Sequence, residues 1–152
     1  DLGVVGKDTL AEAGKNVAEL VDLGYGRCVM VVAVPKSAGI KRVTDLDFNS
    51  RIASKYPRIA QTYFQSQGIQ AEIIPLHGSI ELGPIIGLSD AIVDITETGK
   101  TLVENGLETI AEVMESTCRL VANRASFKMR YGEIIHLVRA VKGVIDVENR
   151  KD

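Results

Sequence analysis

The sequence predicts an α/β protein, and three observations lead to this prediction. Between residues 51 and 106, short apolar runs alternate with segments whose apolar residues recur at helical spacing. A strand–helix–strand order implies parallel pairing with right-handed crossovers. Residues 28–34 are apolar and β-branched, as in a central strand, and residues 134–145 carry the apolar face of a long helix.

The amino-terminal part of the sequence is predicted to form two strands with a helix between them. Residues 2–5 predict a short strand, and the turn at 6–8 is suited to capping a helix over residues 9–13. The apolar strand 28–34 comes next and stops at a proline. The stretch 36–50 is polar and aperiodic, so we interpret it as a loop and a first domain boundary.

Three strand–turn–helix units follow. In the first, Pro57 suits the first turn of a helix and Gly68 suits its left-handed end. In the second, Ser79 can cap the helix. The three units are residues 51–68, 69–87 and 91–106, and two further strands are predicted at 107–114 and 118–122.

Composition narrows the class of protein. The 152 residues are 45% hydrophobic and 25% charged with a net charge of −2, which is typical of a folded domain. No basic block indicates a nucleic-acid surface, and no apolar run is long enough to span a membrane. Cys28 and Cys118 are interpreted as reduced, buried thiols of a cytoplasmic protein, with a disulfide or metal pair as the alternative. His77 and His136 show no ligand spacing with them.

The stretch 90–102 contains the main candidate site. A buried-type strand ends near Asp94, breaks at Gly99 and resumes as a helix at Thr101. Such a turn directs backbone N–H groups and the positive end of a helix dipole at one point, which favours an anion. Hydroxyl donors surround it at Thr96, Thr98 and Thr101.

Asp94 distinguishes this turn from a simple phosphate loop. Its carboxylate can accept from two vicinal ribose hydroxyls or hold a bridging cation. The alternative of a turn that binds no ligand stays open, because Thr-Gly turns are common and an aspartate at a strand end is often only a cap.

Ligands of parallel sheets bind at the carboxyl ends of the strands. Three predicted turns share that edge: residues 54–56, 77–79 and 96–101. We favour a cleft position over packing for Lys55 and Tyr56. Ser79 is equally well explained as a helix N-cap.

Six stretches together resemble the ATP phosphoribosyltransferase family, the first enzyme of histidine biosynthesis. They occur in the family's order and at about its spacing from residue 1 to about residue 128. They are residues 1–8 (DLGVVGKD), 52–57 (IASKYP), 78–82 (GSIEL), 87–94 (GLSDAIVD), 98–102 (TGKTL) and 105–107 (NGL).

The resemblance implies a two-lobed fold similar to the type II periplasmic binding proteins, with substrates in the cleft between the lobes. The first lobe is then expected to contain residues 1–36 and 118–152, without its amino-terminal part. Residues 41–116 form the second lobe, which carries the phosphate turn.

The implied reaction joins N1 of ATP to C1 of phosphoribosyl pyrophosphate (PRPP) and releases pyrophosphate. Asp94 is the implied catalytic residue and holds the ribose hydroxyls. Mg²⁺ is implied to neutralise the charge of the pyrophosphate, and the residues that bind the metal are left unassigned. The expected PRPP-binding residues are Asp94, Thr96, Glu97, Thr98, Gly99, Lys100 and Thr101. Further cleft candidates are Ser54, Lys55, Tyr56, Gly78, Ser79 and Glu81.

Some side chains in these sets have restricted roles. Glu97 should point away from the phosphate, Lys100 is equally well a solvated helix lysine, and Glu81 is a cleft or first-turn carboxylate rather than a proton-transfer group.

The sequence departs from the family pattern at both ends. The Leu-Pro-Lys-Gly-Arg-type opening is absent, and we expect that an amino-terminal segment is missing from this sequence. The histidine-binding regulatory domain of long members is also absent, which implies the short form. Short forms act with a regulatory subunit similar to histidyl-tRNA synthetase in a hetero-octamer. The alternative function is a non-catalytic two-lobed protein that binds a small anion or solute, and Asp94 beside the Thr98-Gly99 turn argues against it.

Overall fold

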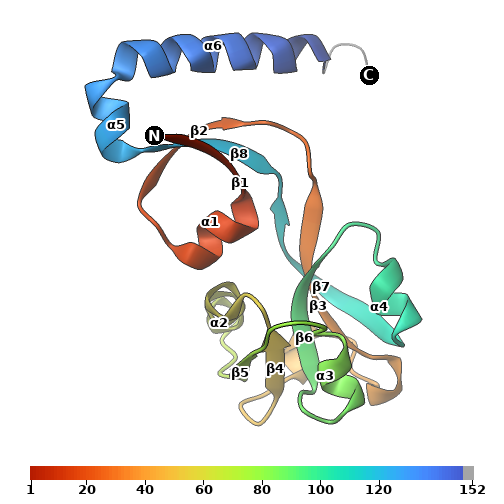
Figure 1. Cartoon of the computed structure of the whole chain (residues 1–152). Helices are drawn as coiled ribbons and strands as arrows, with labels where there is room; N and C mark the ends of the chain where they lie inside the picture. Colours follow the sequence, from red (N-terminus) through yellow and green to blue (C-terminus); the bar gives the residue numbers. More distant parts are fainter. Residues whose placement is uncertain (149–152) are drawn as a thin grey trace. The chain divides into compact units, whose positions relative to one another are not determined.

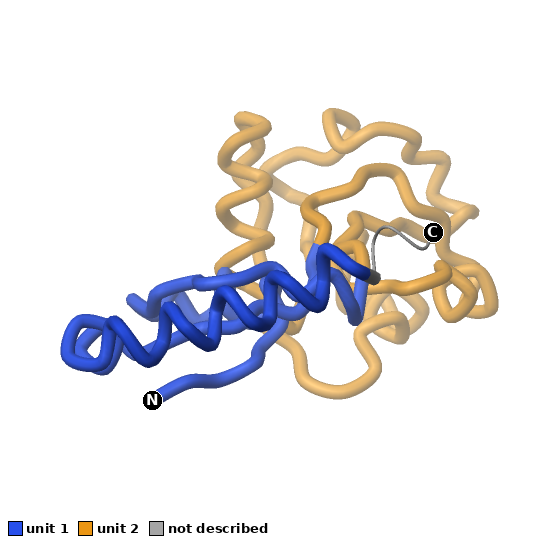
Figure 2. Tube along the Cα trace, turned by 90° about the horizontal axis from the view of Figure 1, so that it is seen from above, with its two compact units in different colours: residues 1–27, 116–152 blue, residues 28–115 orange. Residues whose placement is uncertain are grey.

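The computed structural model describes residues 1–148, which fold into two compact units (Figure 2). Within these residues, unit 1 consists of residues 1–27 and 116–148, and unit 2 consists of residues 28–115. The chain therefore passes between the units twice. The first boundary between the two domains was predicted in the polar loop after Pro35. The long apolar strand before that loop pairs within the sheet of unit 2, so the boundary precedes it.

Unit 1 is built on a three-stranded antiparallel sheet in the order β1-β8-β2 (Figure 1). Two elements of this unit were not predicted. Strand β2 contains a register shift between Glu19 and Val21, which interrupts its alternation of buried and exposed side chains, and α5 is only six residues long. The strands are β1 (Leu2–Gly6), β2 (Val17–Asp22) and β8 (Cys118–Asn123), and the helices are α1 (Lys7–Ala13), α5 (Arg124–Met129) and α6 (Tyr131–Glu148).

Helix α6 buries one face on the sheet of unit 1. Ile134 and Val138 are buried against β2 and β8, as predicted. Leu137 and Val144, which the sequence placed on the same apolar face, are 41% and 61% exposed. The buried stripe is therefore narrower than the sequence indicated.

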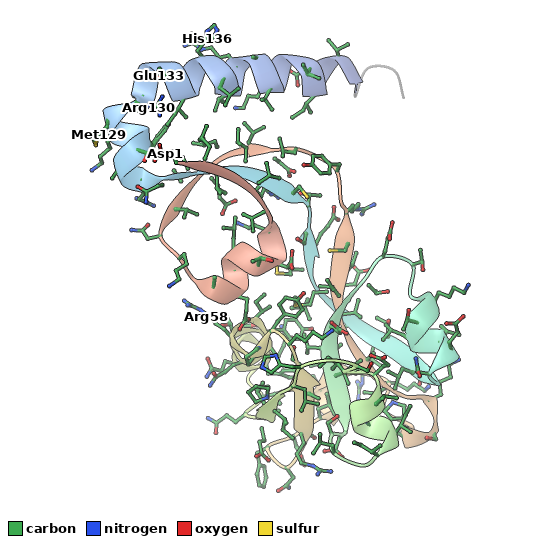
Figure 3. The ribbon with its side chains drawn as sticks, viewed as in Figure 1. Asp1, Arg58, Met129, Arg130, Glu133 and His136 are labelled. Atoms are coloured by element: carbon green, nitrogen blue, oxygen red, sulfur yellow. The ribbon has the colours of Figure 1, made fainter. Side chains whose placement is uncertain are left out.

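The start of α6 is held by ion pairs of Arg130. Its guanidinium lies 2.6 Å from a carboxylate oxygen of Glu133 and 3.6 Å from one of Asp1, which ties the first residue to this helix (Figure 3). His136 lies on the side of α6 that faces away from the sheet. Its side chain is exposed.

Unit 2 contains a five-stranded mixed sheet in the order β5-β4-β6-β3-β7 (Figure 1). Strand β4 pairs in parallel with both β5 and β6, which confirms the predicted parallel pairing. Strand β3 joins β6 antiparallel. The strands are β3 (Cys28–Pro35), β4 (Arg51–Ser54), β5 (Glu72–Pro75), β6 (Ala91–Thr96) and β7 (Leu107–Ser116), and the helices are α2 (Pro57–Ser66), α3 (Leu82–Ile85) and α4 (Lys100–Glu104).

The core of unit 2 fixes the edge at which the candidate site lies. Ile52 and Ala53 of β4 and Ile92 and Val93 of β6 are fully buried. Because β4, β5 and β6 run parallel, their carboxyl ends lie at one edge of the sheet. The turns that follow these strands are the three turns that were predicted from the sequence to share this edge.

Helix α3 differs from its prediction. It is a single turn whose N-cap position is Glu81, without a side-chain cap, so Ser79 does not cap it. Gly83 and Pro84 lie inside this segment, and both residues disfavour a longer helix. The thiols of Cys28 and Cys118 are half-buried rather than buried.

Candidate functional site

The turn between β6 and α4 is organised by its own threonine hydroxyls. Strand β6 ends at Thr96, whose hydroxyl oxygen accepts the backbone N–H of Gly99 at 2.8 Å. Thr98 accepts the N–H of Lys100 at 3.4 Å. Each hydroxyl acts as an acceptor within the turn, so its proton remains available to donate to a ligand oxygen.

Gly99 gives this turn its shape. Its φ of +75° lies in the left-handed region, which favours glycine, and a Cβ built at this position would meet no protein atom within 4 Å. The backbone is therefore approachable at the point where α4 begins. The N–H groups of Gly99 and Lys100 donate to the threonine hydroxyls, while those of the next helical residues lack intrahelical partners, so this open side suits an anion.

A pocket of about 270 Å³ opens beside the turn. This volume is close to the lower end of the roughly 300–1,000 Å³ range of small-molecule pockets. It is lined by Glu81, Asp94, Ile95, Thr96, Glu97, Thr98, Thr101 and Leu102. The structure thus brings six predicted side chains together, from β6, α4 and the segment before α3.

Asp94 lies inside β6 rather than after it, opposite Val31 of β3. Burial raises the pKa of its carboxyl group above the usual value, and the neighbouring charge of Glu81 raises it further. The N–H of Ile95, which donates to the carboxylate at 2.9 Å, and the charge of Lys55 lower the pKa. Asp94 is therefore a partly desolvated carboxyl group whose pKa is raised by burial, and the two donors oppose this rise.

Lys55 and Tyr56 follow the carboxyl end of β4, as predicted. Lys55 is exposed and Tyr56 half-buried, and neither lines the pocket. The charge of Lys55 nevertheless acts on Asp94. This electrostatic contact links the β4 turn to the β6 strand.

Five other candidates do not line the pocket, and one of them, Gly99, belongs to the turn described above. Ser54 is fully buried, and its hydroxyl bonds to backbone groups, so it is not a cleft residue. Lys100 is exposed and 3.8 Å from Glu104, which agrees with a solvated helix lysine. Gly78 and Ser79 are exposed in the turn between β5 and α3.

Sequence reasoning missed the apolar wall of the pocket. Ile95, which is 37% exposed, and Leu102 line it beside the threonines. Side chains alternate between the two faces of a strand, so the sequence pattern placed Ile95 on the face of β6 opposite to Asp94 and gave no signal that both would line one pocket.

The donor set of the pocket suits a cation held mainly by a substrate. Its lining holds the carboxylates of Glu81, Asp94 and Glu97, and magnesium sites commonly combine one or two carboxylates with substrate phosphates. Among residues 1–148, no group of three or more His, Cys, Asp or Glu side chains is placed to hold a metal by itself. Within the same residues, no helix has the length and apolar character needed to cross a bilayer.

Comparison with known proteins decides the family. The family model described as HisG, ATP phosphoribosyltransferase, matches residues 1–143. The chain belongs to the ATP phosphoribosyltransferase family. The resemblance stated from the six motifs is thereby confirmed.

Curated ATP phosphoribosyltransferases align with nearly the whole chain. The protein from Halothermothrix orenii is 46% identical over 149 residues, which are 98% of this chain and 67% of that relative. The protein from Moorella thermoacetica is 51% identical over 146 residues, 93% of this chain and 64% of the relative. The chain thus spans about two thirds of the length of these relatives.

Solved structures agree with the family and the fold. The ATP phosphoribosyl transferase (HisG:HisZ) complex from Thermotoga maritima matches with a TM-score of 0.83 and 38% identity, covering 96% of this chain and 70% of that chain. The arginine-bound form of truncated ArgBP from T. maritima matches with a TM-score of 0.58 and 15% identity, covering 85% of this chain and 60% of that chain. The second likeness concerns the fold alone and confirms the predicted fold class.

Proposed function

We propose that the protein to which this chain belongs is an ATP phosphoribosyltransferase, which transfers the phosphoribosyl group of PRPP to N1 of ATP in the first step of histidine biosynthesis. One observation carries the proposal. In a chain of this family, Asp94 and the threonine turn before α4 line the same pocket. A ligand with a phosphate at one end and vicinal hydroxyls at the other matches this pair of groups.

The β6–α4 turn holds the 5-phosphate of PRPP in this proposal. The hydroxyls of Thr96, Thr98 and Thr101 donate to phosphate oxygens, and the backbone at Gly99 allows close approach. Glu97 also lines the pocket and is exposed, so its carboxylate must turn toward solvent when the phosphate is bound. The turn is formed by internal hydrogen bonds before the ligand arrives, so little reorganisation accompanies binding.

Asp94 accepts hydrogen bonds from the ribose hydroxyls and thereby fixes C1 for attack by N1 of ATP. Positive, oxocarbenium-like charge develops on the ribose as pyrophosphate leaves, and an ionised carboxylate beside the ring stabilises it. When bound, Mg²⁺ neutralises the negative charge of the departing pyrophosphate. Asp94 and Glu81 are the residues of this pocket that would hold it, together with substrate oxygens.

The proposal extends to partners and location. The similar T. maritima structure is a HisG:HisZ complex, which supports a hetero-oligomer with a regulatory subunit. In this proposal the subunit resembles histidyl-tRNA synthetase and the assembly is a hetero-octamer. The protein acts in the cytoplasm. Without that partner, we expect weak or absent activity and no inhibition by histidine.

The substitution Asp94→Asn tests this function directly. It preserves volume but removes the charge and one acceptor, so kcat/KM for PRPP should fall by about a hundredfold or more in the full-length protein assembled with its partner. The control is Asp146→Asn, the same change at an exposed position of α6. Unchanged PRPP kinetics in the Asp94 variant would remove the aspartate from the site.

A non-catalytic binding protein is the competing function, because proteins such as ArgBP share the fold. Release of pyrophosphate from PRPP that requires ATP separates the two. A binding protein retains both compounds unchanged.

A further inference from the structure

Ser54 is the last residue of β4, and its side chain is fully buried. Its hydroxyl donates to the backbone carbonyl of Val93 at 2.6 Å. The same oxygen accepts the backbone N–H of Tyr56 at 2.9 Å. One buried hydroxyl therefore joins β6 to the turn that follows β4.

The position of this hydroxyl in the sheet explains why it is needed. Ser54 and Val93 form the last pair in the parallel register of β4 and β6. On its other side Ser54 accepts the N–H of Leu76 through its backbone carbonyl at 2.9 Å. Beyond this point β4 leaves the sheet, and the serine hydroxyl supplies the final contact to β6 in place of a backbone group.

The two groups joined by Ser54 adjoin the functional residues. Val93 precedes Asp94, and Tyr56 follows Lys55, whose charge lowers the pKa of Asp94. Fixing Val93 and Tyr56 against one oxygen therefore fixes the lysine turn relative to the aspartate. Loss of the hydroxyl would leave a buried carbonyl and a partly buried N–H without this partner.

We propose that Ser54 is a positioning residue for the PRPP site, which holds the Lys55–Tyr56 turn against the strand that carries Asp94. This inference rests on the proposed function. Ser54 does not contact the substrate. It acts on binding through the geometry of its two neighbours.

The test compares Ser54→Ala with Ser89→Ala in the full-length protein with its partner. Ser89 is a matched control because it is also a buried serine of unit 2, and its hydroxyl has no hydrogen-bond partner among residues 1–148. Ser54→Ala should raise KM for PRPP about tenfold or more, since small displacements of binding groups are costly, while KM for ATP changes far less. Ser89→Ala should leave both constants unchanged.

Two further variants separate position from stability. Ser54→Thr keeps the hydroxyl and should recover most of the PRPP affinity. Ser54→Cys nearly keeps the volume but offers only a weak donor, so it should reproduce the PRPP defect even if the alanine variant does not fold. Equal PRPP constants in the cysteine variant and the wild type would overturn the proposal.

A double-mutant cycle distinguishes this inference from the proposed function. If Ser54 acts through the surroundings of Asp94, Ser54→Ala should raise KM for PRPP much less in an Asp94→Asn background than in the wild type. Full additivity would overturn the positioning role. If Asp94→Asn alone has no effect, the proposed function fails instead, whatever the serine variants show.

Discussion

Two strand-to-helix turns of this protein have related sequences, but one is filled by a side chain of its own and the other is open. The β1–α1 turn of unit 1 reads Gly6-Lys7-Asp8-Thr9-Leu10, and the β6–α4 turn of unit 2 reads Gly99-Lys100-Thr101-Leu102. Both place a glycine at the N-cap position of a helix. The second opens into a pocket that carries the proposed phosphate site.

The turn of unit 1 is closed by its own carboxylate. Asp8 is buried in the first turn of α1, accepts the hydroxyl of Ser116 at 2.6 Å and donates its N–H to the same oxygen at 3.0 Å. Gly6 has a φ of −65°, and a Cβ there would lie 2.3 Å from a carboxylate oxygen of Asp8. The negative charge favoured at a helix start is thus supplied internally.

The turn of unit 2 leaves the anion position at the start of its helix open. Gly99 has a positive φ, and among residues 1–148 no protein atom lies within 4 Å of a Cβ built there. Of the two acids that precede it, Asp94 lies back within β6 and Glu97 is exposed. In these two turns, the position of the acid separates a structural cap from an open turn. An acid after the glycine fills the anion position, and an acid before it leaves the position vacant for a phosphate.

The largest expected effect comes from closing the open turn. Gly99→Val places a branched side chain where the phosphate should lie, so kcat/KM for PRPP should fall by more than about a hundredfold. The positive φ adds strain of about 1 to 2 kcal/mol to the folded state. Steady-state kinetics with the full-length protein and its partner measures the first effect and thermal unfolding the second.

Gly39→Val is the matched control for this strain. Gly39 also has a positive φ, +71°, and nothing within 4 Å of a built Cβ, but it lies in the loop after β3. Its variant should lose similar stability and keep its PRPP kinetics. If the Gly99 variant keeps wild-type kinetics as well, the β6–α4 turn is not the phosphate site.

The next effect concerns the closed turn. Asp8→Ala removes a buried acceptor and leaves Ser116 without it, so the free energy of unfolding should fall by about 2 kcal/mol. PRPP affinity per folded molecule should be preserved, because the proposed site lies in unit 2. Chemical denaturation and calorimetric titration with PRPP measure these two quantities. A PRPP defect without a loss of stability would mean that both turns take external anions.

The smallest expected effect is a pH dependence set by Asp94. Burial and Glu81 raise its pKa in the folded state, so kcat/KM for PRPP should fall with decreasing pH earlier than an ordinary aspartate would require. The stability effect has the opposite sign. A raised folded pKa means that the folded protein binds the proton more tightly, so the carboxyl group favours folding below the unfolded pKa and loses this contribution as pH rises through the folded pKa.

The substitution Asp94→Asn tests whether the Asp94 carboxyl group causes this pH dependence of stability. The variant should be as stable as the wild type or more stable at neutral pH, and the change in stability that the carboxyl causes in acid should disappear. Thermal unfolding across the acidic range provides the measurement. A wild-type pH profile of stability in the variant would assign that titration to another group.

The local turn chemistry of unit 2 could be predicted from the sequence because it depends on neighbouring residues. The break at Gly99, the helix start at Pro57 and the cap at Gly68 all appear in the structure, with positive φ at both glycines. The parallel pairing of β4, β5 and β6 followed from their alternation with helices.

Features that depend on distant residues could not be predicted. The antiparallel pairing of β3 with β6 joins segments about sixty residues apart and moves the unit boundary ahead of β3. Ser54 was expected in the cleft, but its hydroxyl turns inward because the carbonyl of Val93 needs a partner where β4 leaves the sheet. The burial of Asp8 likewise depends on Ser116, which lies 108 residues further along the chain.

The most direct test of the central claim is a crystal structure of the protein with PRPP bound. The account predicts the 5-phosphate against the hydroxyls of Thr96, Thr98 and Thr101, and both ribose hydroxyls on the carboxylate of Asp94. A structure in which the sugar phosphate lies elsewhere while this turn holds only solvent would contradict it.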